Sequence, residues 1–195
     1  MKVTIVLTGL MIATGAAAAA DPPVSPPAQH HHQAGPHAQS ETQRPNMIAT
    51  PQSIQTEHHE LHETLASASR EPGDLGAAAR GLEAALAPHF RREEEIATPP
   101  LGLLAALAHG PATAEMRAVL PMTEALEREL PQMLREHQGI VEAAGRFRAA
   151  AETSGRQEFV RFADNLAAHA RQEEEILYPA AVLVGRYVAA TAPQR

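Results

Sequence analysis

The chain has 195 residues, of which 44% are hydrophobic and only 3% aromatic, and its formal net charge at pH 7 is −7. The absence of cysteine excludes disulfides, thiolate metal sites, cysteine nucleophiles and a lipid anchor on a cysteine after a leader. The acidic balance, without any cluster of basic residues, argues against a partner that is nucleic acid or an anionic membrane surface.

The first 49 residues are predicted to lie outside the folded domain. Residues 1–20 have the pattern of a secretory signal peptide, with a positive start, an apolar run and small residues before Asp21. A retained membrane helix is the alternative, and the short, glycine-interrupted run does not favour it. Residues 21–49 are rich in Pro, Gln, Ala and His and are expected to be a disordered linker that binds metal at most loosely. The mature protein would then be periplasmic or secreted, without a stable membrane anchor.

Residues 50–190 are predicted to form an all-α domain, because a chain rich in alanine and poor in aromatic residues suits packed helices better than a sheet. The first helix begins at Thr50-Pro51 and runs to about Ser69. The second covers residues 74–96 and should bend at Pro88. A short helix over residues 101–107 is expected to close one end.

Prolines complicate the second half of the domain. The third helix begins around Thr113, and Pro121 and Pro131 mean that it is either kinked or starts near Pro131. The fourth helix covers residues 156–177 and is ended by Pro179; residues 180–190 then add a last turn or two, and residues 191–195 form a tail. Short connections between these helices predict an up-down-up-down antiparallel four-helix bundle.

One motif occurs twice. The first copy runs from His89 to Glu95 and is followed by Pro99; the second runs from His169 to Glu175, 80 positions later, and is followed by Pro179. Each copy is preceded by a Glu-His pair, at residues 57–58 and again 79 positions later at 136–137. Two features that recur at nearly the same offset indicate a duplicated αα-hairpin.

The duplicated pattern predicts a metal centre. A His and a Glu four residues apart lie on the same face of a helix, and here that face is the apolar one. A buried carboxylate needs a cation, and neither Lys nor Arg falls on the same stripe. With the companion histidines, the candidate ligands are His58, His89, Glu93, His137, His169 and Glu173. Four imidazoles and two carboxylates suit a pair of first-row transition ions and leave coordination positions open.

Other residues near the motif are expected to play smaller roles. A lone buried His is more often a hydrogen-bonded core residue, and a run of Glu is usually a solvated helix end, but the repetition favours the metal interpretation. Glu94 and Glu174, which follow the ligands, rotate away and should be exposed or support the ligands, and so should Glu95 and Glu175. His62, one turn beyond His58, is a possible extra ligand.

The sequence resembles the bacterial hemerythrin-like (HHE cation-binding) domain family. The resemblance covers residues 50–190 and rests on four motifs, at residues 57–61, 89–95, 135–140 and 169–179. It implies a four-helix bundle around a non-haem centre of two iron ions joined by an oxo or hydroxo bridge. Oxygen-carrying hemerythrins have a further His one turn after the third-helix His, where this chain has Val141.

Three functions remain open from the sequence. The first is an exported di-iron protein that binds or senses O2, NO or a peroxide, as a monomer or weak oligomer. The second is storage or buffering of iron, and the third is a metal-free helical interaction module. The sequence does not indicate an enzymatic role, because it shows no candidate nucleophile or general base apart from the predicted metal ligands.

Overall fold

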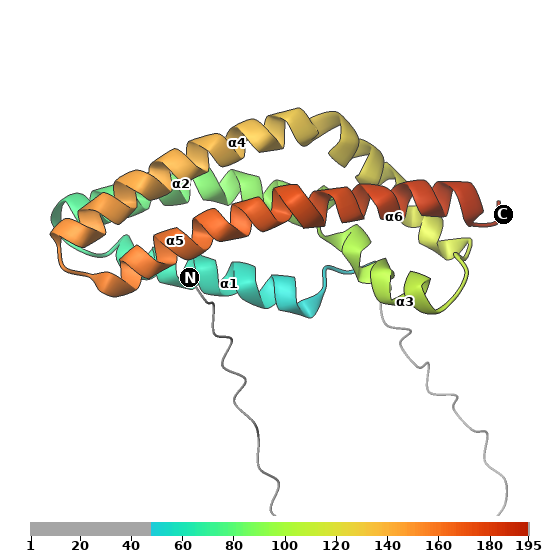
Figure 1. Ribbon diagram of the computed structural model, residues 1–195, viewed down its shortest axis with the longest axis horizontal. Helices are drawn as coiled ribbons and strands as arrows, with labels where there is room; N and C mark the ends of the chain where they lie inside the picture. The colour runs from blue at the N-terminus through green and yellow to red at the C-terminus, as the bar shows by residue number, and fades with distance from the viewer. Residues whose placement is uncertain (1–47, 195) are drawn as a thin grey trace, which may run out of the picture. The chain divides into compact units, whose positions relative to one another are not determined.

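The computed structural model describes residues 48–194, so the predicted signal peptide and most of the predicted linker lie outside the described residues. The described part is all-helical, and its long helices are α1 (Gln52–Ala68), α2 (Gly73–Ile96), α4 (Leu120–Thr153), α5 (Gln157–Gln172) and α6 (Tyr178–Thr191). The 3-10 helices η1 (Pro99–Leu103) and η2 (Glu115–Val119) flank the short α3 (Leu104–His109). Figure 1 shows α5 and α6 following one another along one path, which makes the fourth arm of the predicted bundle.

The helices form a closed ring of neighbours. Contacts join α1 to α2, α2 to α4, α4 to α5 and α5 back to α1. Each hairpin has a glycine in the left-handed region: Gly73, the first residue of α2, has φ 67°, and Gly155, in the turn between α4 and α5, has φ 68°. Only glycine adopts this conformation without steric cost, so both hairpins of the duplicated unit reverse direction in the same way.

Prolines lie inside two of the long helices. α2 runs through Pro88, and α4 begins at Leu120 and continues through Pro131. The third arm is therefore one long, kinked helix and does not start afresh near Pro131. Pro121 occupies the first turn of α4, where a backbone N–H has no partner to lose. Figure 1 shows α4 bending along its length, as expected where an interior proline removes a hydrogen bond.

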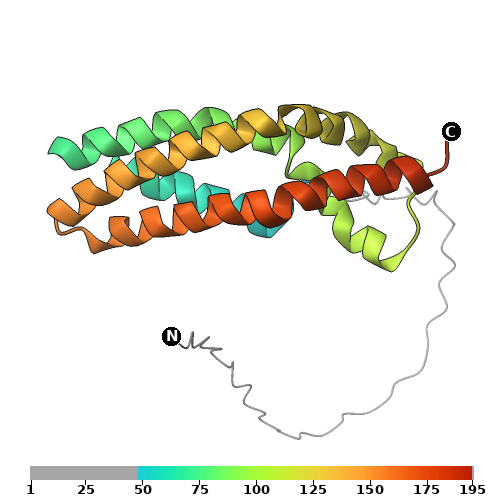
Figure 2. The same ribbon diagram turned by 45° about the horizontal axis from the view of Figure 1, so that its top comes forward.

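The prediction that Pro179 ends the fourth helix is wrong. A π-helical turn, η3 (Glu173–Leu177), joins α5 directly to α6, and Pro179 lies in the first turn of α6. The wider π turn changes the hydrogen-bond register, so the missing N–H of proline falls where no ladder bond is needed. The first copy of the motif does end its helix, at Ile96, before Pro99 and Pro100. Figure 2 shows the resulting uninterrupted fourth arm.

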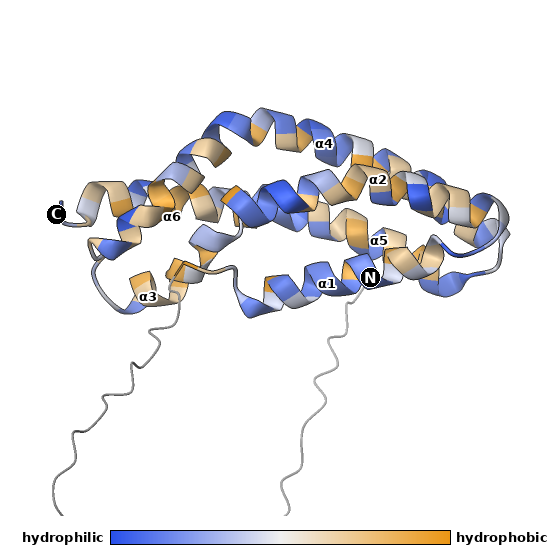
Figure 3. Cartoon of the chain, turned by 180° about the vertical axis from the view of Figure 1, so that it is seen from behind, coloured by the Kyte–Doolittle hydropathy of each residue, from blue (hydrophilic) through white to orange (hydrophobic). Residues whose placement is uncertain are grey.

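The core is divided into layers along the bundle. One apolar cluster includes Leu65, Leu82, Phe147 and Leu166, and a second includes Ile54, Ile96, Met133 and Tyr178. On each arm the predicted metal ligands fall between residues of these two clusters. The outer faces of α1 and α4 are largely hydrophilic (Figure 3). Within residues 48–194, no helix has both the length and the apolar character needed to cross a bilayer.

Candidate metal centre

All six predicted ligands converge in the middle of the bundle. α1 contributes His58, α2 contributes His89 and Glu93, α4 contributes His137, and the fourth arm contributes His169 and Glu173. Each residue is at most 5% exposed. The only other buried polar residues in the described chain are Thr98 and Thr123, so this layer holds nearly all of the buried polarity.

The ligand atoms fall into two groups that share one carboxylate. His89, Glu93, His137 and Glu173 form one group, and His58, His169 and Glu173 form the other, with the atoms of each group within 4.8 Å of one another. Glu173 Oε1 lies 2.7 Å from His169 Nε2, and Glu173 Oε2 lies 3.3 Å from His137 Nε2. Glu173 therefore presents one oxygen to each group, the arrangement that a carboxylate bridging two ions requires.

Five polar atoms in this layer are buried and lack a hydrogen-bond partner. They are His58 Nδ1, His58 Nε2, Glu93 Oε2, His169 Nε2 and Glu173 Oε1, and the only other such side-chain atom among the described residues is Thr113 Oγ1. His169 Nε2 and Glu173 Oε1 are close but do not have hydrogen-bond geometry. Because an unpaired buried polar group costs about 1–3 kcal/mol, such a concentration is unfavourable unless a cation binds there. Nitrogen and carboxylate donors fit a first-row transition ion.

A second set of carboxylates surrounds the imidazoles. Each histidine turns its Nδ1 toward a glutamate from a neighbouring arm, and the pairs are His169–Glu57, His137–Glu174, His89–Glu136 and His58–Glu94. The first three contacts are hydrogen bonds of 3.0, 2.8 and 2.9 Å. A donor Nδ1–H leaves the Nε2 lone pair facing the centre, as metal ligation requires.

These pairs form a ring around the bundle. Each arm supplies one histidine and one outer glutamate, and every pair joins two neighbouring arms. Of the two glutamates that the sequence left as either exposed or supporting, Glu174 accepts a hydrogen bond from His137 on another arm, and Glu94 lies 3.6 Å from His58 on another arm. Glu57 and Glu136, which the sequence marked only as companions of a His, do not pair with their own neighbours; each orients a histidine on another helix. The weakest pair is His58–Glu94, at 3.6 Å.

Sequence reasoning missed Tyr178. Its side chain is 1% exposed, and its hydroxyl donates a short hydrogen bond to Glu93 Oε1. The hydroxyl oxygen also lies 3.2 Å from His137 Nε2 and 3.4 Å from His89 Nε2. Burial, together with the nearby Glu93, raises the pKa of Tyr178 far above its ordinary value, so the hydroxyl keeps its proton. The position of a rare tyrosine one residue before Pro179 was the available signal, but only the π turn brings its hydroxyl to Glu93.

Without metal, the pKa values of the two central carboxylates are shifted in opposite directions. Burial, reinforced by Glu173, raises the pKa of Glu93 well above its ordinary value. Burial also disfavours ionised Glu173, but the nearby imidazoles of His137, His169 and His58 outweigh it and hold the pKa of Glu173 low. In the metal-free centre, Glu93 therefore takes up a proton more readily than Glu173, which lies among the imidazoles.

Three residues close to the predicted ligands in the sequence or on the same helix lie outside the centre. His62 is exposed and touches the edge of the Phe90 ring, with 5.1 Å between centroids, and it belongs to neither ligand group. His59 is also exposed and pairs with Glu63. Val141 is 44% exposed, so a histidine at this position would not face the centre as α4 is now rotated. The absent fifth histidine thus leaves no gap in this core.

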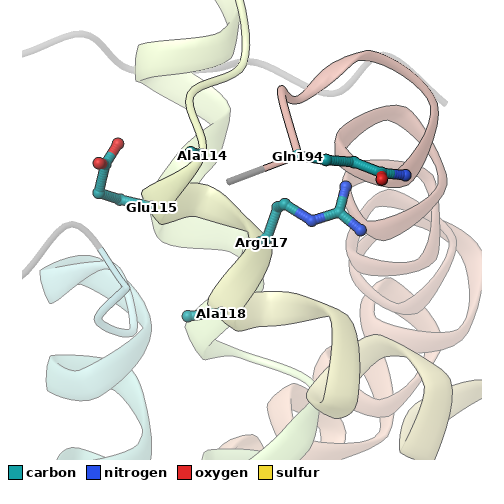
Figure 4. A pocket seen from close by; sticks show the side chains of 5 residues that line it. All are labelled: Ala114, Glu115, Arg117, Ala118 and Gln194. Carbon is teal, nitrogen blue, oxygen red and sulfur yellow. The ribbon is translucent and has the colours of Figure 1, made fainter.

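A surface hollow of about 590 Å³ lies away from this chemistry. It is lined by Ala114, Glu115, Arg117, Ala118 and Gln194 (Figure 4). Arg117 and Gln194 approach one another in Figure 4, whereas Glu115 lies on the other side of η2. The lining contains none of the six predicted ligands, so its size does not make it the functional site.

Comparison with known families gives one match. The sequence model described as the hemerythrin HHE cation binding domain matches residues 50–181. The matched residues include all six converging side chains and Tyr178. No curated protein and no solved structure matches the chain.

Proposed function

The chain belongs to the hemerythrin HHE cation binding domain family, and we propose that it holds two iron ions at which O2, NO or a peroxide binds. The family and the buried His and Glu residues together indicate a metal-binding helical protein. Iron, the pairing of two ions and the small ligand are the parts that we propose.

The five buried atoms without hydrogen-bond partners carry this proposal. Four of them, all but His58 Nδ1, point toward one another at the centre: each lies within 3.9 Å of another atom of the four. A folded protein tolerates unpaired polar atoms in its core when a ligand satisfies them. Imidazole nitrogens and carboxylate oxygens are a donor set that iron accepts, and the shared Glu173 supports two ions over one.

The protein side of the centre suits reversible chemistry. Three of the outer glutamates hold imidazole rings by hydrogen bonds, Tyr178 donates a hydrogen bond to Glu93, and Phe90 stacks on His58 with 4.4 Å between ring centroids. These contacts hold the donor atoms in place when the charge at the centre changes. Bound iron would supply a change of oxidation state and open coordination positions.

Metal loading without oxygen tests the proposal. The purified protein should take up about two ferrous ions per chain, because the donors form two groups, and its absorption spectrum should change when O2 or NO is added. Iron that exchanges freely and gives no spectral change with either gas would favour iron buffering. If the protein takes up no iron from a ferrous salt, the remaining hypothesis is that it is a metal-free interaction module.

We also propose that the mature protein is exported. The support is the pattern of residues 1–20 in the sequence. N-terminal sequencing of protein recovered from fractions of its host should find Asp21 as the first residue, outside the cytoplasm. An intact Met1 on protein in the cytoplasmic fraction would contradict this.

A further inference from the structure

A surface hollow of about 360 Å³ lies beside α1, against the metal centre. Its lining consists of Thr50, Gln55, His58, His59, His62 and Glu94. One of these residues, His58, is also a predicted ligand, so the hollow reaches the wall of the centre. No Lys or Arg is among the lining residues, which present imidazole, carboxylate, hydroxyl and amide groups.

His58 spans the wall between the hollow and the centre. Its Nδ1 lies 3.6 Å from Glu94 Oε1, and Glu94 is half-exposed in the hollow. Its Nε2 lies 3.7 Å from Glu173 Oε1 and 3.9 Å from Glu93 Oε2, on the inner side. The ring is only 2% exposed, yet neither nitrogen makes a hydrogen bond. One imidazole therefore offers an unpaired nitrogen to each side.

His58 is also the one central histidine that makes no hydrogen bond to its outer glutamate. The other three are fixed by hydrogen bonds of 2.8–3.0 Å to their outer glutamates. His58–Glu94, the outer pair without a hydrogen bond, is thus the pair that borders the hollow. The equivalent pair in the second half of the duplicated unit, His137–Glu174, is a hydrogen bond of 2.8 Å. The two halves therefore differ at this contact.

The hollow provides further donors one turn away. His62 follows His58 by four residues on α1, so both lie on the same face of the helix. Glu94 faces them from α2, and His59 is exposed beside them with Glu63 at 3.4 Å. Exposed imidazoles and carboxylates bind a hydrated divalent transition ion without the cost of burying it.

We propose that this hollow is a capture site for a divalent transition-metal ion on its way to the centre. His62 and Glu94 hold the ion at the surface, and His58 passes it from its Nδ1 side to its Nε2 side. This inference rests on the proposed function, because it assumes that the centre binds metal. It gives His62 a role outside the buried ligand set.

Uptake kinetics test the proposal on the full chain. Ferrous ions are mixed without oxygen with the wild type, with the His59→Gln/His62→Gln variant and with a His109→Gln control. His109 is an exposed imidazole on α3, and its Nδ1 lies 2.7 Å from the carbonyl oxygen of Ala105. The histidines of residues 21–49 are present in every sample, so their contribution is common to all.

Loss of the surface donors should slow the initial uptake by roughly three- to tenfold, because local charge and donors raise the encounter rate. The final iron content should not change, and the control should match the wild type. Equal rates in the variant and the wild type would overturn the proposal. A fall in final content would overturn it too, by making His62 a resident ligand.

A second measurement separates this site from the centre. In a Glu93→Gln/Glu173→Gln variant the buried carboxylates are gone, and added Mn²⁺ should still broaden the imidazole NMR signals of His59 and His62, and broaden them more than those of His89, His137 and His169. Broadening confined to other histidines would refute the capture site. If the wild type takes up no iron but this broadening is seen, the proposed function fails while the surface site stands.

Discussion

His89 on α2 and Glu136 on α4 are joined by a hydrogen bond of 2.9 Å between Nδ1 and a carboxylate oxygen. Glu136 lies next to the predicted ligand His137 in the sequence, but it serves a histidine on another helix. The same crossing of helices occurs for Glu57 and His169. The Glu and the His of each repeated Glu-His pair therefore do not bind one another. The Glu of each pair binds a histidine on another helix, so these contacts form only when the bundle assembles.

Substitution of Glu136 by Gln should weaken metal binding without unfolding the protein. The amide cannot keep His89 oriented as a carboxylate does, and loss of such a contact typically lowers metal affinity about 10- to 100-fold. A chelator-competition titration measures this. Glu142→Gln, at an exposed glutamate of the same helix, is the matched control. Equal affinity in the two variants would show that the outer carboxylate does not support the ligand.

Removal of each central carboxylate should leave a different number of bound metal ions. Glu173 belongs to both ligand groups, whereas Glu93 belongs to one. Glu93→Ala should keep about one metal ion per chain at the His58, His169 and Glu173 group, and Glu173→Ala should keep less, because each group loses a donor. Metal analysis after gel filtration measures both. Two ions bound in either variant would contradict the role assigned to that carboxylate.

Tyr178→Phe should destabilise the metal-free protein by about 1–3 kcal/mol, because it leaves Glu93 without its hydrogen-bond donor in the core. The aromatic ring remains, so its stacking on His137 is kept. Urea unfolding of Tyr178→Phe and of the exposed control Tyr187→Phe gives the comparison. The deficit should shrink when metal is bound, because the ion then pairs with Glu93. A deficit that is the same with and without metal would mean that Glu93 does not bind the ion.

Gly185→Ala should disturb the packing of α6 on α4. A Cβ at residue 185 would lie 2.1 Å from Thr123 Oγ1, a contact that requires the helices to separate. Overpacking of this kind costs about 1–3 kcal/mol. Gly139→Ala is the control, because a Cβ there meets nothing within 4 Å. It should be neutral or stabilising by up to about 1 kcal/mol, since alanine favours the helix. Thermal unfolding that ranks the two variants in the opposite order would refute this packing.

Metal uptake should strengthen as pH rises. Burial lowers the pKa of His137 and His169, but the nearby Glu173, together with Glu174 for His137 and Glu57 for His169, outweighs it and raises both pKa values above the ordinary value. A protonated imidazole cannot bind metal, so uptake must release these protons and should weaken as pH falls. In the metal-free protein the same shift stabilises the fold below pH 6.5, and this contribution is lost as pH rises through the raised values. Calorimetry in buffers of different ionisation enthalpy counts the protons, and uptake independent of pH between 5 and 8 would contradict the prediction.

The sequence was sufficient for the fold class and for bringing the six central residues to one layer. Helical periodicity fixes which side chains share a face, and the 80-residue repeat marks the same face on each half. His89 and Glu93, for example, are one turn apart whatever the helix packs against. These properties are local, so they can be read along one helix at a time.

Other features depended on tertiary structure. Which glutamate faces which histidine depends on the axial shift and rotation of one helix against another, and these are set by packing between distant residues. The chain stays helical through Pro179, whereas α2 ends before Pro99. The difference arises because the π turn after His169 changes the backbone register. That turn brings Tyr178 to Glu93. The sequence by itself therefore determined the helices and their inward faces, while the assembled bundle decided the partners of each ligand and left His58 as the open side of the centre.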